Sequence, residues 1–585
     1  MNTDPKHGLF RPAIQDVIVS TIPKTNVSAP HTPLQNQPMI QMAARNWSRS
    51  VSVYPRKRVW CVHQWLRCGV AAGALAVGSA SANAQRPIPP LPDSTGWGVH
   101  VLAVARDAQG AIWVGTYGQG IYRLPLGATA WQSIRHDSTG TSISQDFVQA
   151  LAFGSRGEVW YGTIGNGWGL STDGGATWKN WTYPQLGPEW QYVAPSGIVV
   201  RGDTTVIGTA DGLQVTTNNG GSWMAIGDAV GPRARGPADT VFPILSSEYV
   251  RRVAADRRGW TVATLRGNQR LRRTETGWEA QPLTAAAFPP GNALLIGRQL
   301  IRGTPCGLRP DSDTLPCLRQ AGAPADAPRA PLTTWFRRPI ALKDNSFIDQ
   351  TYRYGSTMGG NFQQHQGVEF NNPDGTPVYA IGRGTVVYAG PAEQGALTVT
   401  IRHDTTVSAH GRRYRIFSTY YHNSALKVRL GQKVRRGALI SLVGHTGRAT
   451  NDHLHLEISA SPSDSLSLVV DSTQRFPPYT TNPELWIEPL AETGIVAGQV
   501  LDAAGAPVPQ ARIYGIIKRE PVETPFSYAE TYGDKAHPHP LYGEHFAVSD
   551  VPAGTYTVGT EIEGKKVFRQ ITVEVGKVSW VVFKP

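Results

Sequence analysis

The sequence predicts an all-β protein of several domains: a β-propeller, an antiparallel β-domain and a small C-terminal β-sandwich. The length of 585 residues suggests three or four domains, at roughly 100 to 200 residues each. A short strand-like segment recurs at nearly constant spacing after residue 97, and short apolar runs separated by glycine turns fill most of the remaining chain. The 62 Gly and 44 Pro residues favour turns and strands over long helices.

Residues 1–84 form a leader that carries a secretory signal. Three basic residues, Arg56-Lys57-Arg58, precede an apolar run at 69–82 and the small-residue pattern Ala82-Asn83-Ala84, which predicts cleavage near 84/85. The apolar run has about 14 residues, fewer than the roughly 20 that span a bilayer, so no transmembrane anchor is expected. The protein is therefore predicted to be exported: periplasmic, cell-surface or secreted.

Charge and cysteine content agree with export. The formal charge is +13, but the leader holds nine Lys or Arg against two Asp, which leaves +6 for the rest. This mild excess suits an anionic envelope surface and is also common on protein surfaces generally. No basic run with interleaved aromatic residues is present, so nucleic acid is not an expected partner. Cys306 and Cys317 are predicted to form a disulfide; two buried thiols are the alternative.

The propeller is predicted over residues 97–320. The segments 111–116, 158–163 and 205–209 share a Gly-Thr ending, and their glycines are 47 and then 46 residues apart. Periods near 40 to 50 residues with short strands are typical of propeller blades. About five blades would fill this region.

Two further segments, 171–178 and 216–223, resemble the Asp-box turn of sialidase-like propellers. In such a turn Asp173 or Asn218 would accept hydrogen bonds from backbone N–H groups, while Trp178 or Trp223 would pack beneath the next strand. No sialidase-type catalytic set accompanies the turns, so this region is interpreted as a scaffold or binding platform with a protein or glycan partner.

Residues 321–332 are rich in Pro and Ala and predict a semi-rigid linker. The next domain is predicted over 333–490 with its core at 362–459, where short strands and glycine turns alternate. Residues 495–585 resemble the carboxypeptidase-regulatory-like β-sandwich in the segments 495–508 and 551–556. Such a module would bind or space other domains. His537, His539 and His545 in its loop are interpreted as solvated, with a metal site as the alternative.

Seven of the fifteen histidines lie between His365 and His455. Hydrolysis with zinc needs three N or O ligands, an open position for water, and groups that accept a proton and stabilise the oxyanion. His365 and Glu369 are four residues apart, about 13 Å in an extended strand, so their convergence requires a bend, which Gly367 can supply. His453 and His455 share one face of a strand, because side chains alternate. His422 follows another strand pattern and offers a further imidazole.

These pieces resemble, in order, the signature of lysostaphin-type (LytM-like) zinc metallopeptidases: His-x-Gly-x-acid at 365–369, Tyr-x-His at 420–422, Gly-His-Thr-Gly at 444–447 and His-Leu-His-x-Glu at 453–457. The resemblance implies that His365, Glu369 and His455 hold Zn²⁺, while His422 and His453 act on water and on the tetrahedral oxyanion. It also implies a peptidoglycan stem peptide or cross-bridge, or another extracellular peptide, as substrate.

Two positions depart from the family pattern. Glu369 stands where the family has Asp, and Asn423 stands where Leu is common. The longer side chain leaves open an alternative, a catalytically inactive LytM-like protein that binds or regulates cell-wall hydrolases. A third hypothesis is a surface recognition protein whose propeller carries the function. His403 and His410 are interpreted as solvated or capping residues, and His445, Arg448 and Asn451 as residues at the edge of the cleft.

Overall fold

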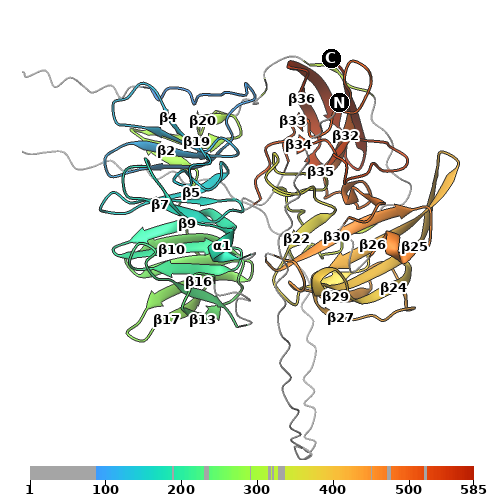
Figure 1. The fold of residues 1–585 in the computed structure, drawn as a ribbon, viewed down its shortest axis with the longest axis horizontal. Coiled ribbons are helices and arrows are strands. Elements are labelled where there is room, and N and C mark those ends of the chain that lie inside the picture. Colours follow the sequence, from blue (N-terminus) through green and yellow to red (C-terminus); the bar gives the residue numbers. More distant parts are fainter. Residues whose placement is uncertain are drawn as a thin grey trace, which may run out of the picture. The chain divides into compact units, whose positions relative to one another are not determined.

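In the described part of the chain, the computed structural model has nearly all of its regular secondary structure in β-strands (Figure 1). It describes residues 87–187, 190–229, 236–289, 291–313, 318, 322–326, 336–449, 451–470, 476–518 and 524–585. Within these ranges the single α-helix is α1 (Tyr183–Leu186), and the 3-10 helices are η1 (Glu393–Gly395), η2 (Leu466–Leu468) and η3 (Pro483–Leu485). None of the described helices has the length and apolar character needed to cross a membrane. The predicted leader lies outside the described residues.

Five small sheets follow one another along the first part of the chain. The first sheet contains β1 (Val101–Arg106), β2 (Ile112–Thr116), β3 (Ile121–Leu124) and β4 (Gln132–Ile134), and the second contains β5 (Val148–Phe153), β6 (Val159–Thr163), β7 (Trp168–Ser171) and β8 (Lys179–Trp181). The third contains β9 (Val193–Arg201), β10 (Thr204–Thr209), β11 (Gly212–Thr216), β12 (Met224–Asp228) and β13 (Thr240–Leu245). The fourth contains β14 (Val250–Asp256), β15 (Gly259–Thr264), β16 (Gly267–Arg273) and β17 (Trp278–Leu283), and the fifth contains β18 (Ala293–Ile296), β19 (Gln299–Thr304) and β20 (Gly307–Pro310). Neighbouring strands pair antiparallel except β12 and β13, which are parallel.

The repeated segments are the second strands of the first three sheets. Their glycines lie where one sheet packs on the next: a Cβ at Gly115, Gly162 or Gly208 would lie 2.6, 2.4 or 2.7 Å from Val148, Val193 or Val250, respectively. These valines belong to β5, β9 and β14, the first strand of the following sheet. The repeat is therefore maintained by close packing between sheets. A Cβ at Gly303 of the fifth sheet would likewise come too close to Val101 of β1, so the fifth sheet packs closely on the first. The propeller stays a prediction.

The two predicted turn caps form. Asp173 Oδ1 accepts hydrogen bonds from the backbone N–H groups of Ala176 and Thr177 at 3.0 and 2.9 Å, and Asn218 Oδ1 accepts one from Ser222 N–H at 2.9 Å. The Thr177 hydroxyl also donates to this carboxylate, and together with the Thr177 N–H and the Ser171 hydroxyl it favours the ionised form and lowers the pKa of Asp173 to about 2. Trp178 and Trp223 are buried, the first against Tyr161 and the second against Trp160.

The second part of the chain forms a larger antiparallel sheet with a smaller one beside it. The large sheet has the order β22 (Val368–Asn371), β30 (His453–Ser461), β26 (Arg412–Tyr421), β25 (Leu397–Ala409), β24 (Gly384–Pro391), β28 (Lys433–Val434), and β31 (Thr480–Thr481) pairs with β30; the small sheet has the order β23 (Pro377–Tyr379), β29 (Leu439–Val443), β27 (Asn423–Leu426). Alternate residues such as Val368, Phe370, Leu454 and Leu456 are buried in one apolar core. The remaining residues of β22 and β30 therefore point to the opposite face.

The C-terminal region, residues 493–585, contains two three-stranded sheets and a two-stranded one. They are built from β35 (Phe546–Pro552), β32 (Thr493–Val500) and β38 (Val578–Phe583); β21 (Ala323–Pro324), β37 (Lys565–Val573) and β36 (Gly554–Ile562); β33 (Arg512–Ile513) and β34 (Ala529–Glu530). Strands of both larger sheets share one apolar core. Two residues of the predicted linker thus form β21, which pairs with β37.

The structure bears on two of the sequence predictions, the disulfide and the loop histidines. Cys306 is disulfide-bonded, whereas its predicted partner Cys317 lies outside the described residues. The interpretation of His539 as solvated was wrong: this ring is buried and lies 4.2 Å from the ring of Trp486, between centroids. Burial lowers the pKa of His539 to about 3. Among the described residues, the group that could hold a metal ion does not include His537, His539 or His545.

Candidate metal centre

The candidate site is built on the pairing of β22 with β30. The two strands are antiparallel, with Glu369 directly opposite His455 and Asn371 opposite His453. Because Val368, Phe370 and Leu454 occupy the core face, Glu369 and both histidines share the other face. Strand register alone thus brings together residues more than eighty positions apart.

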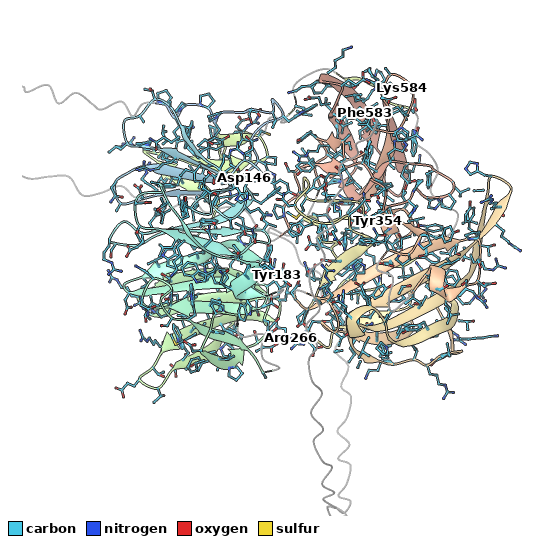
Figure 2. The ribbon with its side chains drawn as sticks, viewed as in Figure 1. Asp146, Tyr183, Arg266, Tyr354, Phe583 and Lys584 are labelled. Carbon is cyan, nitrogen blue, oxygen red and sulfur yellow. The ribbon has the colours of Figure 1, made fainter. Side chains whose placement is uncertain are left out.

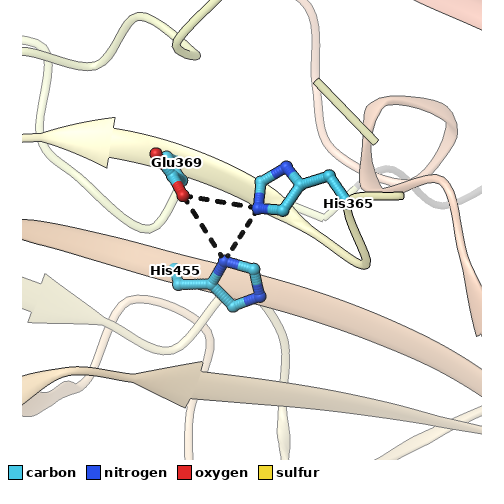
Figure 3. Close-up of side chains that lie close together, drawn as sticks. All are labelled: His365, Glu369 and His455. Carbon is cyan, nitrogen blue, oxygen red and sulfur yellow. Dashed lines mark hydrogen bonds and ion pairs between the residues drawn. The ribbon is translucent and has the colours of Figure 1, made fainter. Parts of the chain in front are cut away.

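Three donor atoms converge at this place (Figure 3). His365 Nε2 lies 3.2 Å from His455 Nδ1 and 3.3 Å from Glu369 Oε1, and His455 Nδ1 lies 4.0 Å from Glu369 Oε1. Four ligands placed tetrahedrally about 2.1 Å from zinc would lie roughly 3.4 Å from one another. Two imidazole nitrogens and one carboxylate oxygen at these separations fit a zinc ion with one position left over. The longer side chain of Glu369 therefore still brings a carboxylate oxygen close to both imidazole nitrogens.

The bend that brings His365 to the site lies just before β22. A Cβ on Gly367 would lie 2.5 Å from the carbonyl oxygen of Leu456 and 2.8 Å from His455 Nε2, so only glycine permits this close approach to β30. The ring of His365 stacks on Tyr352, with centroids 4.2 Å apart and an interplanar angle of 15°. The structure thus requires glycine at position 367, and the reason is the close packing of the chain against β30.

Glu457 contacts the ring nitrogen of His455 that does not belong to the three donor atoms. His455 Nε2 lies 3.4 Å from Glu457 Oε1, and with the ring proton on Nε2 donated to this oxygen the Nδ1 lone pair would face Glu369 and His365. Burial, together with the charge of Glu393, raises the pKa of Glu457 well above its usual range. Tyr421, opposite His455 in the β26–β30 pairing, lies beside both residues. Sequence reasoning assigned no role to Glu457 or Tyr421.

The electrostatics of the site favour ligand forms of these groups. Burial opposes ionisation of Glu369, but the charges of His453, His365 and His455 outweigh it and hold the pKa of this carboxyl well below its usual range. Burial, together with the charges of His365 and His422, lowers the pKa of His455 well below its usual value. An ionised carboxylate and a neutral imidazole are the forms that bind a metal.

His422 and His453 lie beside the three donor atoms. Their ring centroids are 4.8 Å apart, and His453 Nε2 lies 3.7 Å from Glu369 Oε1. The Nδ1–H of His422 donates to the Thr446 carbonyl at 2.9 Å, and that of His453 donates to the Asn451 carbonyl at 2.8 Å. His422 has a φ of 63°, in the left-handed region that few residues other than glycine adopt. The five predicted site residues are thus brought together.

The other singled-out residues are placed as follows. His445 Nδ1 contacts the carboxylate of Asp452, whose second oxygen accepts a hydrogen bond from Asp374 N–H at 2.9 Å. Asn423 is buried and donates from Nδ2 to the carbonyls of Leu397 and Tyr420 at 2.7 and 2.8 Å, which explains an amide at this position. Arg448 and His410 are exposed.

The interpretation of His403 as a solvated or capping residue was wrong. Its side chain is buried, its Nε2 lies 2.8 Å from Ser418 Oγ, and its ring packs on Phe336 with centroids 4.5 Å apart. His403 is a core residue of the large sheet, away from the candidate centre.

Comparison with known proteins identifies the segment that carries this site. Residues 363–465 match the model of peptidase family M23, close to the predicted core of 362–459. Peptidoglycan DD-endopeptidase ShyA of Vibrio cholerae is 40% identical over 94 residues, which are 16% of this chain and 20% of that protein. DD-carboxypeptidase/endopeptidase Mpg of Neisseria meningitidis is 33% identical over 112 residues, 19% of this chain and 24% of that protein.

The chain thus spans only about a fifth to a quarter of the length of these relatives. The structure of the antimicrobial peptidase lysostaphin from Staphylococcus simulans, at 20% identity, covers 40% of this chain and 95% of that chain with a TM-score of 0.18. The two strands that carry Glu369, His453 and His455 lie within the matched segment. Residues 363–465 of this chain therefore form a peptidase family M23 domain.

Proposed function

We propose that the chain is an exported zinc metalloendopeptidase that hydrolyses peptide bonds of peptidoglycan stem peptides or cross-bridges. The observation that carries the proposal is the convergence of His365 Nε2, Glu369 Oε1 and His455 Nδ1 within 4.0 Å of one another, with His422 and His453 beside them. The relative named as a peptidoglycan DD-endopeptidase supports the substrate class, and the segment with this site is the one that matches peptidase family M23.

The residues divide the chemistry among them. His365, Glu369 and His455 would hold Zn²⁺, which when bound would lower the pKa of water toward about 7 and polarise a peptide carbonyl. His422 and His453 each hold their Nδ1–H on a backbone carbonyl, which leaves Nε2 of each ring to exchange a proton. One ring accepts the proton of the attacking water; the other, protonated, donates a hydrogen bond to the tetrahedral oxyanion. No covalent enzyme intermediate is required.

Glu369 favours a second candidate function, a catalytically inactive LytM-like protein that binds or regulates cell-wall hydrolases. Its extra methylene places Oε1 within 3.7 Å of His453 Nε2 as well as near the two predicted ligand rings. A carboxylate held by His453 would compete with the role of that ring in catalysis. The two functions differ in whether the wild-type protein cleaves.

The test combines metal analysis with digestion of isolated sacculi. The wild-type protein is expected to contain about one zinc ion per chain and to release peptides whose masses identify the cleaved bond, whereas His455→Ala loses both properties. Glu369→Asp is the matched comparison. If the wild type is inert and Glu369→Asp cleaves, the regulatory function replaces the enzymatic one.

We propose further that the first five sheets bind an anionic glycan of the envelope. An open hollow of about 540 Å³ at the ends of β9, β10, β15 and β16 is lined by Trp260, by one carboxylate, Asp203, and by five arginines, namely Arg201, Arg257, Arg258, Arg272 and Arg273. Within the described ranges none of the five is ion-paired with a carboxylate, so their charge is available to an anionic polymer. Arg272→Glu with Arg273→Glu should weaken sedimentation with sacculi and leave hydrolysis of a soluble peptide unchanged; unchanged sedimentation would refute this binding.

A further inference from the structure

The loop that leads to His365 is held by the C-terminal region. This loop, residues 353–364 and hereafter the ligand loop, precedes β22 and has no strand of its own among the described residues. Its polar groups bond Glu530, Lys535, His537 and Ala547 of the C-terminal region, and also Thr480 and Glu484 before it; all lie more than a hundred positions away in the sequence. A region expected only to bind or space thus contacts the segment that positions a predicted metal ligand.

Glu530 on β34 makes the most concentrated of these contacts. Its Oε2 accepts hydrogen bonds from Thr357 N–H at 2.7 Å and from Ser356 Oγ at 2.8 Å, and its Oε1 accepts one from Gly359 N–H at 3.0 Å and one from Thr357 Oγ1 at 3.3 Å. The carboxylate is buried, with 6% of its residue surface exposed. Both oxygens are therefore saturated by one turn of the ligand loop.

The turn that binds Glu530 has an uncommon backbone. Met358, Gly359 and Gly360 have φ values of 48°, 69° and 94°, all in the left-handed region, although Met358 carries a buried side chain. Three such residues in succession are unfavourable in an isolated chain. Within the turn the N–H groups of Thr357 and Gly359 donate to Glu530, whereas those of Met358 and Gly360 donate to the hydroxyls of Ser356 and Thr357. Because the carboxylate of Glu530 also binds both hydroxyls, it stabilises this conformation.

The same turn also fixes the backbone of His365. His365 N–H donates to the Ser356 carbonyl at 3.1 Å, and Gly355 N–H donates to the His365 carbonyl at 2.9 Å. Ser356 therefore bonds Glu530 through its hydroxyl and His365 through its carbonyl. Only one residue separates the carboxylate of the C-terminal region from the backbone of a metal ligand.

Neighbouring contacts hold the rest of the ligand loop in the same way. The Tyr354 hydroxyl (Figure 2) accepts a hydrogen bond from His537 N–H and donates to the Thr480 carbonyl, both at 2.8 Å. Gln364 Oε1 accepts a hydrogen bond from Lys535 N–H at 2.8 Å. The buried Arg353 pairs with Glu484 and also donates to the Ala547 carbonyl at 2.9 Å. While these partners are in place, the ligand loop can therefore adopt few other conformations.

We propose that Glu530 is a positioning residue of the metal centre: it orders the ligand loop so that His365 Nε2 stands ready beside Glu369 Oε1 and His455 Nδ1. This inference rests on the proposed zinc function. It makes the C-terminal region a part of the peptidase site, since the loop alone would not hold its left-handed turn.

The experiment compares zinc affinity and amide hydrogen exchange in the full-length protein. Glu530→Ala is expected to lower zinc affinity at least tenfold in chelator competition and to raise exchange of the 356–365 amides in the metal-free protein. Glu561→Ala is the matched control, because Glu561 lies exposed on β36 of the same region. Ser356→Ala removes one of the contacts of Glu530 and is expected to shift both readouts in the same direction by about threefold; it serves as the test should Glu530→Ala fail to fold.

The outcomes separate this inference from the function on which it rests. A wild-type protein that neither binds zinc nor cleaves sacculi would refute the proposed function. If the wild-type protein binds zinc and cleaves sacculi, but Glu530→Ala or Ser356→Ala binds zinc with unchanged affinity, only the positioning role of Glu530 is refuted. Exchange that rises equally in β32 and β35 would show general loosening of the C-terminal region and would also refute it.

Discussion

At the scale of single residues, a buried histidine outside the metal centre carries part of the pH dependence of stability. Burial lowers the pKa of His403 from 6.5 to about 4. Between these values the unfolded chain binds a proton that the folded chain does not, so the free energy of unfolding falls as pH is lowered through this window. The full loss amounts to roughly 3 kcal/mol by pH 4, and it is absent above pH 6.5.

His403→Gln should therefore flatten the decline of stability between pH 6.5 and 4, as measured by urea unfolding at a series of pH values. His410→Gln is the matched control, because His410 is exposed in the turn between β25 and β26. If the decline in His403→Gln is as steep as in the wild type, His403 is not the residue responsible.

The individual residues of the candidate site also show how much of it could be predicted from the sequence. The spacing of His365, Glu369, His453 and His455 is a local pattern, and the structure brings these side chains together with His422. Glu457 closes the His-Leu-His-x-Glu pattern, but the pattern gave it no role, and Tyr421 gave no signal at all. The place of Tyr421 beside His455 depends on the register between β26 and β30, which only the folded sheet defines.

At the scale of elements, the close approach of β22 to β30 depends on Gly367. A methyl group there would meet the Leu456 carbonyl at 2.5 Å, and backbone cannot yield as a flexible side chain does. Gly367→Ala is expected to lower the free energy of unfolding by about 1 to 3 kcal/mol, as overpacking does, and to weaken zinc binding because His455 is displaced. Gly390→Ala on β24 is the control, since a Cβ there meets nothing within 4 Å. Equal urea midpoints for the two variants would contradict the packing argument.

Elements also divide into those that periodicity predicts and those it does not. The glycines at 115, 162 and 208 indicated a repeat, and their contacts with Val148, Val193 and Val250 supply its physical cause. The parallel pairing of β13 with β12 has no such signal, because β13 follows a stretch without the repeat. Local patterns predict strands well, whereas partner choice depends on the rest of the fold.

At the scale of the whole molecule, contacts between distant segments are what the sequence conceals. Glu530 and Thr357 are 173 residues apart, and neither belongs to a motif. The predicted role of residues 495–585, to bind or space other domains, followed from a resemblance. Buried polar networks that join separate segments leave no periodic trace, so the bonds of Glu530 to the ligand loop appear only in three dimensions.

Metal removal tests the molecule as one linked system. The ligands come from the bend before β22 and from β30, so a bound zinc ion would stabilise the folded chain by linking segments that separate on unfolding. At a free zinc concentration 100 times the dissociation constant, the gain is about 2.7 kcal/mol. A chelator should therefore lower the thermal midpoint of the wild type, and added zinc should restore it. His455→Ala should begin at the lower midpoint and respond to neither, because one of its three donors is missing; an equal response in both proteins would place the stabilising zinc elsewhere.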